Sequence, residues 1–242
     1  MQKEYKELLI TDEINIAKSA KAAGRYVVLC YPLKGDDVLP DLSDFPYAVE
    51  NAEELDENYL NHVLCRLKGI PCHILDTDRC RVREITPEDV DELYEIYAQP
   101  GITDYMEDLY ENREDEIAYT LDYIRYHYGF YDFGMWIVED KQSGTIIGRA
   151  GFDMRPESEI PELGFLVRTE YQKQGYATEV CDALLSYGKE YLGFDEVVSY
   201  ADAENAPSVG LLKKLGFVFR EAEIVQSTKT DGRKLDGYLK KL

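Results

Sequence analysis

The sequence has few of the residues that build metal sites. Its 242 residues include three histidines and five cysteines. The cysteines are scattered and odd in number, and no pair of them has the spacing of metal ligands: Cys30, Cys65, Cys72, Cys80 and Cys181. We therefore expect no zinc site and no other metal, and we expect thiols that stay reduced.

Long apolar runs are also missing. No run approaches the roughly 18–20 residues that a membrane-spanning helix needs. The first residues, MQKEYKELL, do not have the form of a signal peptide. These features predict a cytoplasmic protein without a membrane partner, long enough for one large domain or two small ones.

Positively charged residues are also few relative to negatively charged ones. Lys and Arg number 27 against 48 Asp and Glu, so the formal net charge is −21. Such a surface repels the phosphates of nucleic acids and of anionic membranes, and neither is expected as a partner. It favours a cationic small molecule or a basic peptide, although many cytoplasmic proteins are acidic for solubility alone.

Residues 1–75 have the pattern of a small α/β region. A helix is predicted over 12–23, where apolar residues recur at helical spacing and a glycine follows. Strands are predicted over 25–33 and 47–50, and a second helix over 52–67. This incomplete α/β layer is expected to bury its open face on the rest of the chain or on a second copy in a homodimer.

A stretch in this region has two readings. Residues 10–60, through KAAGRYVVLCYP, loosely resemble the later half of haloacid-dehalogenase-like Rossmann domains. Phosphatases of that superfamily present an Asp-x-Asp pair after an apolar strand, as Asp76 and Asp78 do in HILDTDRC. In the alternative, a new strand begins here and its inward-facing residues are Cys80, Val82 and Ile85. We prefer the strand, because Cys80 replaces the usual threonine and no complete phosphatase domain follows.

From residue 77 the order changes to strand, two helices, three strands, helix, strand, helix and two strands. The first helix is predicted over 86–97, with Thr86 as N-cap and Asp89 completing a near capping box. Its buried stripe is predicted to be Val90, Leu93, Tyr94 and Tyr97. The remaining elements are predicted at 113–128, in a hairpin within 134–154, and at 161–167, 177–192, 196–200 and 205–215.

The polar run TEYQKQGYATEV, residues 169–180, holds one glycine just before a predicted helix. The first turn of a helix offers unpaired N–H groups and the positive end of the helix dipole. The run therefore has the form of an anion site, and an ordinary strand-to-helix turn is the alternative.

Four stretches together resemble the GCN5-related N-acetyltransferases: TDRCRVREITPEDVDELY, PELGFLV, YQKQGYATE and NAPSVGLLKKLGF. The resemblance covers about residues 77–242 and is closest to the branch that modifies ribosomal-protein amino termini and related small amines. The family signature, Gln or Arg, two residues, Gly, one residue, Gly or Ala, is met by Gln172, Gly175 and Ala177. The resemblance implies an α/β (α+β) fold with a mixed, mostly antiparallel sheet flanked by helices over 76–242, preceded by the appendage 1–75.

The resemblance implies acetyl-CoA as the acetyl donor. The loop amides would hold its pyrophosphate, and the strand at 164–167 would splay from its neighbour so that its backbone pairs with the pantetheine arm. Gly175 would let the backbone approach the ligand closely. The implied cofactor-binding residues are Phe165, Leu166, Val167, Gln172, Lys173, Gln174, Gly175, Tyr176, Ala177, Thr178 and Asn205.

Acetyl transfer to an amine needs a base, a polarised carbonyl and a proton for the leaving thiolate. The resemblance makes Glu162 the candidate base, with a solvated charge at a strand end as the alternative. It places Asn205 beside the pantetheine and the Ser208 hydroxyl near the sulfur, although helix capping alone would explain both. A backbone N–H near Leu166 or Val167 would polarise the carbonyl. Leu212 stands where many relatives have a tyrosine acid, which leaves the proton donor open.

The acceptor is expected to be an amine, bound by the first two helices, their linker and the hairpin. Within the linker, residues 101–112, acidic and tyrosine side chains could bind an ammonium group: Asp104, Glu107, Asp108 and Glu111 with Tyr105 and Tyr110. The alternative is a solvated acidic face. A second alternative, for the whole protein, is an acyl-CoA-binding regulatory module with little turnover.

Overall fold

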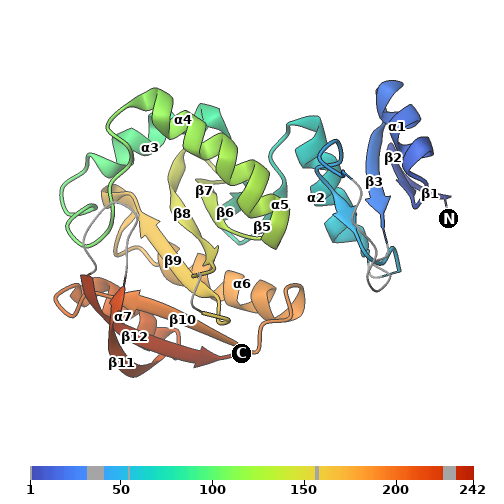
Figure 1. Ribbon diagram of the computed structural model, residues 1–242. Coiled ribbons are helices and arrows are strands. Elements are labelled where there is room, and N and C mark those ends of the chain that lie inside the picture. The colour runs from blue at the N-terminus through green and yellow to red at the C-terminus, as the bar shows by residue number, and fades with distance from the viewer. Residues whose placement is uncertain (1, 32–40, 54, 156–157, 226–232) are drawn as a thin grey trace. The chain divides into compact units, whose positions relative to one another are not determined.

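The computed structural model describes residues 2–31, 41–53, 55–155, 158–225 and 233–242. The chain divides into two compact units (Figure 1). The first contains Met1–Cys72 and Ile124–Asp132, and the second contains His73–Tyr123 and Phe133–Leu242. No helix among the described residues is long and apolar enough to cross a membrane.

The first unit is built on a four-stranded sheet in the order β1-β2-β3-β4. β1 is antiparallel to β2, and β2, β3 and β4 are parallel to one another. The strands are Gln2–Tyr5, Leu8–Thr11, Tyr26–Cys30 and Ala48–Val49, and the helices are α1, Ile14–Ala22, and α2, Glu57–Lys68.

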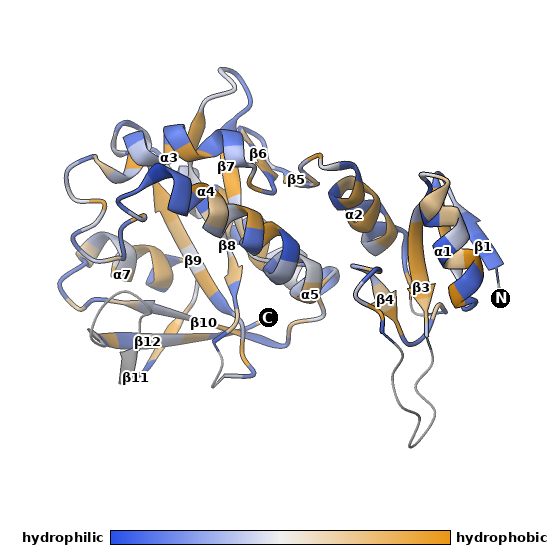
Figure 2. Cartoon of the chain, turned by 45° about the horizontal axis from the view of Figure 1, so that its top comes forward, coloured by the Kyte–Doolittle hydropathy of each residue, from blue (hydrophilic) through white to orange (hydrophobic). Residues whose placement is uncertain are grey.

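Alternation along the strands buries both faces of this sheet. Leu8 and Val28 pack in a cluster with Val63 of α2, whereas Leu9 and Val27 pack in another with Ala17 of α1. Figure 2 shows the apolar strand β3 between the two helices. Covered faces on both sides are typical of parallel strands.

In the first unit, one predicted boundary needs correction and one hairpin was not predicted. The predicted helix over 52–67 begins later, at Glu57, because the Asp56 carboxylate caps it by accepting a hydrogen bond from the Tyr59 N–H (2.7 Å). The hairpin of β1 and β2 precedes the predicted first helix and was missed. The predicted helix over 12–23 and the strands over 25–33 and 47–50 are confirmed in shorter form, and residues 32–33 lie outside the described residues.

The second segment of the first unit continues from α4, Arg113–Asp122, as the π-helical turn Tyr123–Tyr128 and the short α5, Gly129–Tyr131. The carboxylate of Asp132 accepts a hydrogen bond from Arg66 Nη1 (2.7 Å), and His62 Nδ1 lies 3.0 Å from it. The predicted helical pattern over 113–128 is confirmed, and the structure adds that the helix changes from α- to π-helical hydrogen bonding at Tyr123.

The second unit is built on an eight-stranded sheet in the order β11-β12-β10-β9-β8-β7-β6-β5. Neighbouring strands are antiparallel except β9 and β10, which are parallel. The predicted mixed, mostly antiparallel sheet is therefore confirmed. The strands β5 to β12 are His73–Asp76, Cys80–Arg83, Met135–Asp140, Ile146–Asp153, Glu162–Val167, Glu196–Ala201, Val218–Val225 and Arg233–Lys241.

Helices cover both faces of this sheet. α6, Tyr176–Glu190, packs on β8 and β9, and Figure 1 shows α3, Val90–Tyr97, and α4 on the other side. Under α6 the buried rings of Trp136 and Phe152 meet edge to face, with ring centres 6.2 Å apart. α7, Ala206–Lys214, lies beside β10.

The predicted capping box is confirmed in the short 3₁₀ helix Pro87–Asp89, which leads into α3. The Thr86 N–H donates to Asp89 Oδ2 (2.7 Å). Ile96 is buried in the stripe in place of the predicted Tyr94, whose hydroxyl donates instead to the carbonyl oxygen of Tyr110 (2.6 Å). The polar end of Tyr94 therefore faces the linker that follows the helix.

The preferred reading of HILDTDRC is also supported. Cys80, Val82 and Ile85 are buried, and the turn between β5 and β6 carries Asp78. Asp76 pairs with His73 (3.2 Å) and is 41% exposed. The two aspartates thus belong to a hairpin of the second sheet, not to a phosphatase strand of the first.

Arg83 joins three elements near the edge of the sheet. It donates two hydrogen bonds to Asp89 (2.7 and 2.8 Å) and one to Glu139 of β7 (2.7 Å). Replacing Arg83 by methionine is expected to lower the free energy of unfolding by about 3 kcal/mol, because two largely buried carboxylates lose their partner. Urea denaturation measures the change.

The matched control is Arg81→Met, two residues earlier on the same strand. Arg81 is 52% exposed and lies 3.5 Å from Asp76, so its loss is expected to cost less than about 0.5 kcal/mol. Equal losses in the two variants would contradict the structural role of Arg83.

Candidate active site

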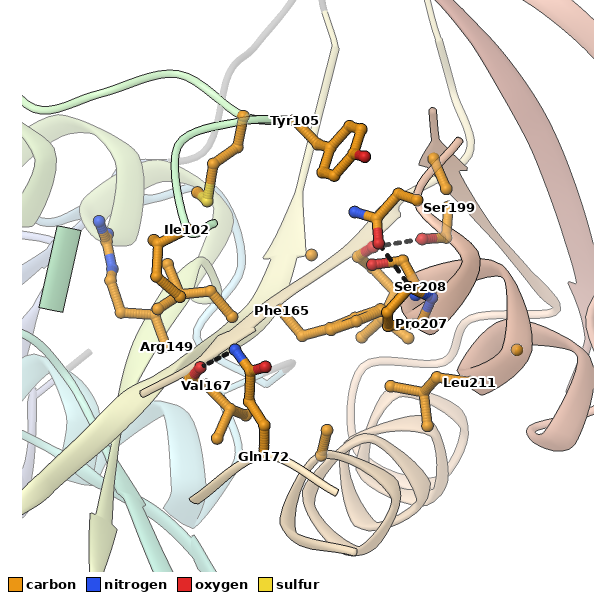
Figure 3. A pocket seen from close by; sticks show the side chains of 18 of the residues that line it. Ile102, Tyr105, Arg149, Phe165, Val167, Gln172, Ser199, Pro207, Ser208 and Leu211 are labelled. Carbon is orange, nitrogen blue, oxygen red and sulfur yellow. Dashed lines mark hydrogen bonds between the residues drawn. The ribbon is translucent and has the colours of Figure 1, made fainter. Parts of the chain in front are cut away.

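A cavity of about 940 Å³ opens where β9, α6 and α7 meet (Figure 3). Its walls include the backbone of β9, the first turn of α6, the start of α7 and the linker after α3. Ile102 and Arg149 lie on one side of Phe165, and Pro207, Ser208 and Leu211 lie on the other (Figure 3). All the lining residues belong to the second unit.

One edge of β9 is left open toward this cavity. β9 pairs with β8 along its whole length, but with β10 at one position only, Glu162 opposite Val198. The buried Ser199 hydroxyl donates to the Leu163 carbonyl oxygen (2.8 Å), and beyond that point the described strands diverge. The predicted splay over 164–167 is confirmed. Backbone groups on this edge can pair with a ligand, as they would pair with another strand.

The loop before α6 has two residues in the left-handed region, Lys173 (φ 59°) and Gly175 (φ 87°). Successive N–H groups in such a turn converge on a concave anion site, and the first helical N–H groups add to it. Gly175, Tyr176, Ala177 and Thr178 all line the cavity. The loop and the open strand edge fit a long ligand that has a phosphate group and an arm of amides.

Two glutamine side chains hold the loop in place. Gln172 Nε2 donates to the Val167 carbonyl oxygen (2.9 Å), and Gln174 Nε2 donates to the Glu170 carbonyl oxygen (2.5 Å). Among the predicted cofactor residues, Gln174 is outside the cavity lining, and the other ten line it: Phe165, Leu166, Val167, Gln172, Lys173, Gly175, Tyr176, Ala177, Thr178 and Asn205.

The start of α7 brings Asn205 and Ser208 into the wall. Asn205 Oδ1 accepts a hydrogen bond from the Ser208 N–H (3.2 Å), so Asn205 is the N-cap of this helix. Both residues line the cavity as well. Leu212, at the position where the resemblance gives many relatives a tyrosine acid, is fully buried and does not line it.

Glu162 lies at the single paired position between β9 and β10. Arg155 Nε donates to Glu162 Oε2 (2.5 Å), and the Arg155 guanidinium stacks on the Tyr200 ring with Cζ 4.1 Å from the ring centre. The Glu162 side chain is 21% exposed. It is therefore neither a fully solvated charge nor surrounded only by apolar groups.

The linker after α3 contributes apolar and aromatic residues to the cavity. Tyr105 lines it, with Ile102 and Met106. The predicted acidic residues of the linker are exposed and outside the lining: Asp104, Glu107, Asp108 and Glu111. Tyr110 is also outside the lining. The geometry thus favours a solvated acidic face over an ammonium-binding cluster.

Three charged residues of the wall were missed from the sequence: Arg149, Asp202 and Lys214. Arg149 lies on β8, and Lys214 Nζ lies 3.4 Å from Thr178 Oγ1 beside the loop. Ser208, Leu211 and Lys214 are spaced three apart on α7, which could have indicated their common face. Among the described residues, no group of three or more His, Cys, Asp or Glu side chains could hold a metal ion.

The chain matches the family model described as an acetyltransferase (GNAT) domain over residues 79–218, more than half of its length. It therefore belongs to the GNAT acetyltransferases, and it is an acetyl-CoA-dependent acetyltransferase.

Its relatives agree. It is 28% identical over 148 residues to the uncharacterised N-acetyltransferase YoaA of Bacillus subtilis (strain 168), covering 60% of this chain and 82% of that one. It is 27% identical over 169 residues to the uncharacterised N-acetyltransferase p20 of Bacillus licheniformis, covering 68% and 93%.

Solved structures share the fold. The ribosomal-protein-S5-alanine acetyltransferase from Vibrio fischeri has a TM-score of 0.58 at 15% identity, over 69% of this chain and 95% of that one. RimL, a ribosomal L7/L12 alpha-N-protein acetyltransferase solved in complex with coenzyme A, has a TM-score of 0.60 at 13% identity, over 71% and 98%.

Proposed function

We propose that this enzyme transfers the acetyl group of acetyl-CoA directly to a primary amine of a small molecule or of a protein N-terminus. The observation that supports it best is the cavity in which the open edge of β9, the loop before α6 and Glu162 meet. Residues 173–178 would hold the pyrophosphate through their backbone N–H groups, and 165–167 would pair with the pantetheine arm.

In this proposal Glu162 accepts the proton of the attacking amine. The amine nitrogen forms a bond to the acetyl carbon and the carbon–sulfur bond breaks. The Ser208 hydroxyl donates a proton to the leaving sulfur, and a backbone N–H of Leu166 or Val167 polarises the carbonyl. Ser208 lines the cavity, whereas Leu212 is buried outside it and has no proton to donate. This supports the serine as the proton donor.

The wall near Ile102 suggests what the acceptor carries beside its amine. Ile102, Tyr105, Met106 and Met135 are apolar or aromatic, and Arg149 adds one cation. We infer an acceptor whose amine is attached to an apolar group, with its ammonium drawn in by the chain's net charge of −21.

The test of the reaction is calorimetric titration with acetyl-CoA, followed by a screen of amines for release of free coenzyme A thiol. Binding with amine-dependent thiol release is expected. Binding without release by any amine class, including N-terminal peptides, would contradict direct transfer to amines.

Ser208→Ala is expected to lower kcat at least tenfold and to leave the affinity for acetyl-CoA within about twofold, because a positioned proton donor contributes to the rate alone. The variant keeps the backbone N–H of residue 208, which donates to Asn205 Oδ1, so the capped start of α7 is preserved. Ser186→Ala is the control, since that exposed hydroxyl on α6 only donates to the Asp182 carbonyl oxygen. A kcat equal to that of the parent enzyme would exclude Ser208 as the acid.

A further inference from the structure

Arg79, in the turn between β5 and β6, reaches across to the loop before α6. Its Nε donates to Glu179 Oε2 (2.7 Å), and its Nη1 donates to the carbonyl oxygen of Gln174 (3.1 Å). Its guanidinium also stacks on the Tyr176 ring, with Cζ 3.9 Å from the ring centre. One side chain thus contacts the loop, the first residue of α6 and the end of its first turn.

Glu179 fixes Arg79 in this position. Its Oε1 accepts hydrogen bonds from the Arg79 N–H (2.9 Å) and from the Thr77 hydroxyl (2.6 Å). Burial raises the pKa of Glu179, but these hydrogen bonds and the Arg79 charge outweigh it and lower the pKa below its usual value. The carboxylate is therefore charged at neutral pH and can hold the guanidinium against the helix.

The contact with Gln174 determines which way a peptide group points. The carbonyl of Gln174 and the N–H of Gly175 belong to one planar trans peptide, in which the two groups point in opposite directions. Because Arg79 holds the carbonyl, the Gly175 N–H is directed the other way. Gly175 lines the cavity, and neither Arg79 nor Gln174 does.

We propose that Arg79 is a positioning residue that fixes the 174–175 peptide with its N–H toward the pyrophosphate site and its carbonyl away from it. Without the guanidinium, this peptide could rotate and present a carbonyl oxygen to the phosphates of acetyl-CoA. The proposal rests on the proposed function, in which the loop holds the pyrophosphate.

The turn that carries Arg79 has its own supports. The Cys80 N–H donates to Thr77 Oγ1 (2.9 Å), and the Lys141 N–H donates to the Arg79 carbonyl oxygen (2.8 Å). Neither bond uses the Arg79 side chain. Removing the guanidinium is therefore expected to release the loop while the hairpin stays folded.

The test compares two acetyl donors. Calorimetry on Arg79→Ala should give an affinity for acetyl-CoA at least tenfold weaker than that of the parent enzyme. Weak binding of S-acetylpantetheine, which has no pyrophosphate, should be unchanged, and so should the melting temperature within a few degrees. Arg79→Lys should behave like Arg79→Ala, since an ammonium cannot reproduce the fork and the stacking. Arg81→Ala, on the exposed side of β6 just after the turn, should match the parent enzyme with both donors.

Equal weakening with both donors, or an unchanged affinity for acetyl-CoA, would overturn the proposal. If Arg79→Ala does not fold, Glu179→Gln replaces it, because the amide keeps the shape of the side chain and weakens the ion pair with Arg79. This variant must also bind acetyl-CoA more weakly, by a smaller factor, with its affinity for S-acetylpantetheine unchanged. If the parent enzyme binds S-acetylpantetheine as tightly as acetyl-CoA, the loop does not hold the pyrophosphate. That result would contradict the proposed function itself, and it can be seen before any variant is made.

Discussion

Glutamate in place of Gly175 is expected to abolish binding of acetyl-CoA in calorimetry, with a loss of at least a hundredfold. The backbone at this position has φ 87°, which costs a residue with a side chain about 1 kcal/mol. The new carboxylate would also stand among the amides that hold the pyrophosphate, where like charges repel. Both effects act within the anion site.

Two further variants separate the causes. Gly175→Ala adds the backbone strain without the charge, and its Cβ would lie 3.5 Å from Arg79 Nη2, an ordinary contact. It should therefore weaken binding about tenfold. Gly193→Ala imposes similar strain at φ 71°, outside the cavity lining, and should lower stability alone. Wild-type affinity in Gly175→Glu would show that the loop is only a turn.

Glutamine in place of Glu162 is expected to lower kcat at least a hundredfold, because positioned bases contribute about 10²–10⁴ to such rates. The amide keeps the shape of the side chain but cannot take a proton at neutral pH. Binding of acetyl-CoA should stay within about twofold, since the amides of the loop are untouched. Steady-state kinetics with the best amine of the screen, at several pH values, measures the effect.

Glu196→Gln is the matched control for this prediction. Glu196 lies at the start of β10, two residues before Val198, which pairs with Glu162. It is outside the cavity lining, so its neutralisation should leave kcat unchanged. A parent-like kcat in Glu162→Gln would move the base elsewhere, to water or another residue.

Most of the second unit could be predicted because its elements have clear periods. The helix at α6 and the hairpin of β7 and β8 follow from helical spacing and strand alternation, and the mixed, mostly antiparallel sheet follows from the family resemblance. The hairpin of β1 and β2 was missed because QKEY is polar and short. The change from α- to π-helical bonding at Tyr123 was not predicted, because the helical pattern over 113–128 does not distinguish the two kinds of helix.

The candidate site was predictable where one segment carries it and not where distant segments meet. Gly175 and its neighbours form a continuous signature, and all but Gln174 of the predicted cofactor residues line the cavity. The bond between Arg79 and Glu179 joins positions a hundred residues apart. Local spacing holds no information on such a pair, nor on the hydrogen bond between Arg155 and Glu162.

The nine residues of the first unit that lie within the acetyltransferase part of the chain, 124–132, bear on where such a protein can be divided. Tyr128 is fully buried and lies 5.7 Å from the Arg66 guanidinium, so a chain that begins at residue 73 would leave an aromatic surface without its cover. Dividing the chain at residue 73 would separate residues 124–132 from the segment they pack with, so neither half of the chain would keep the whole of the first unit.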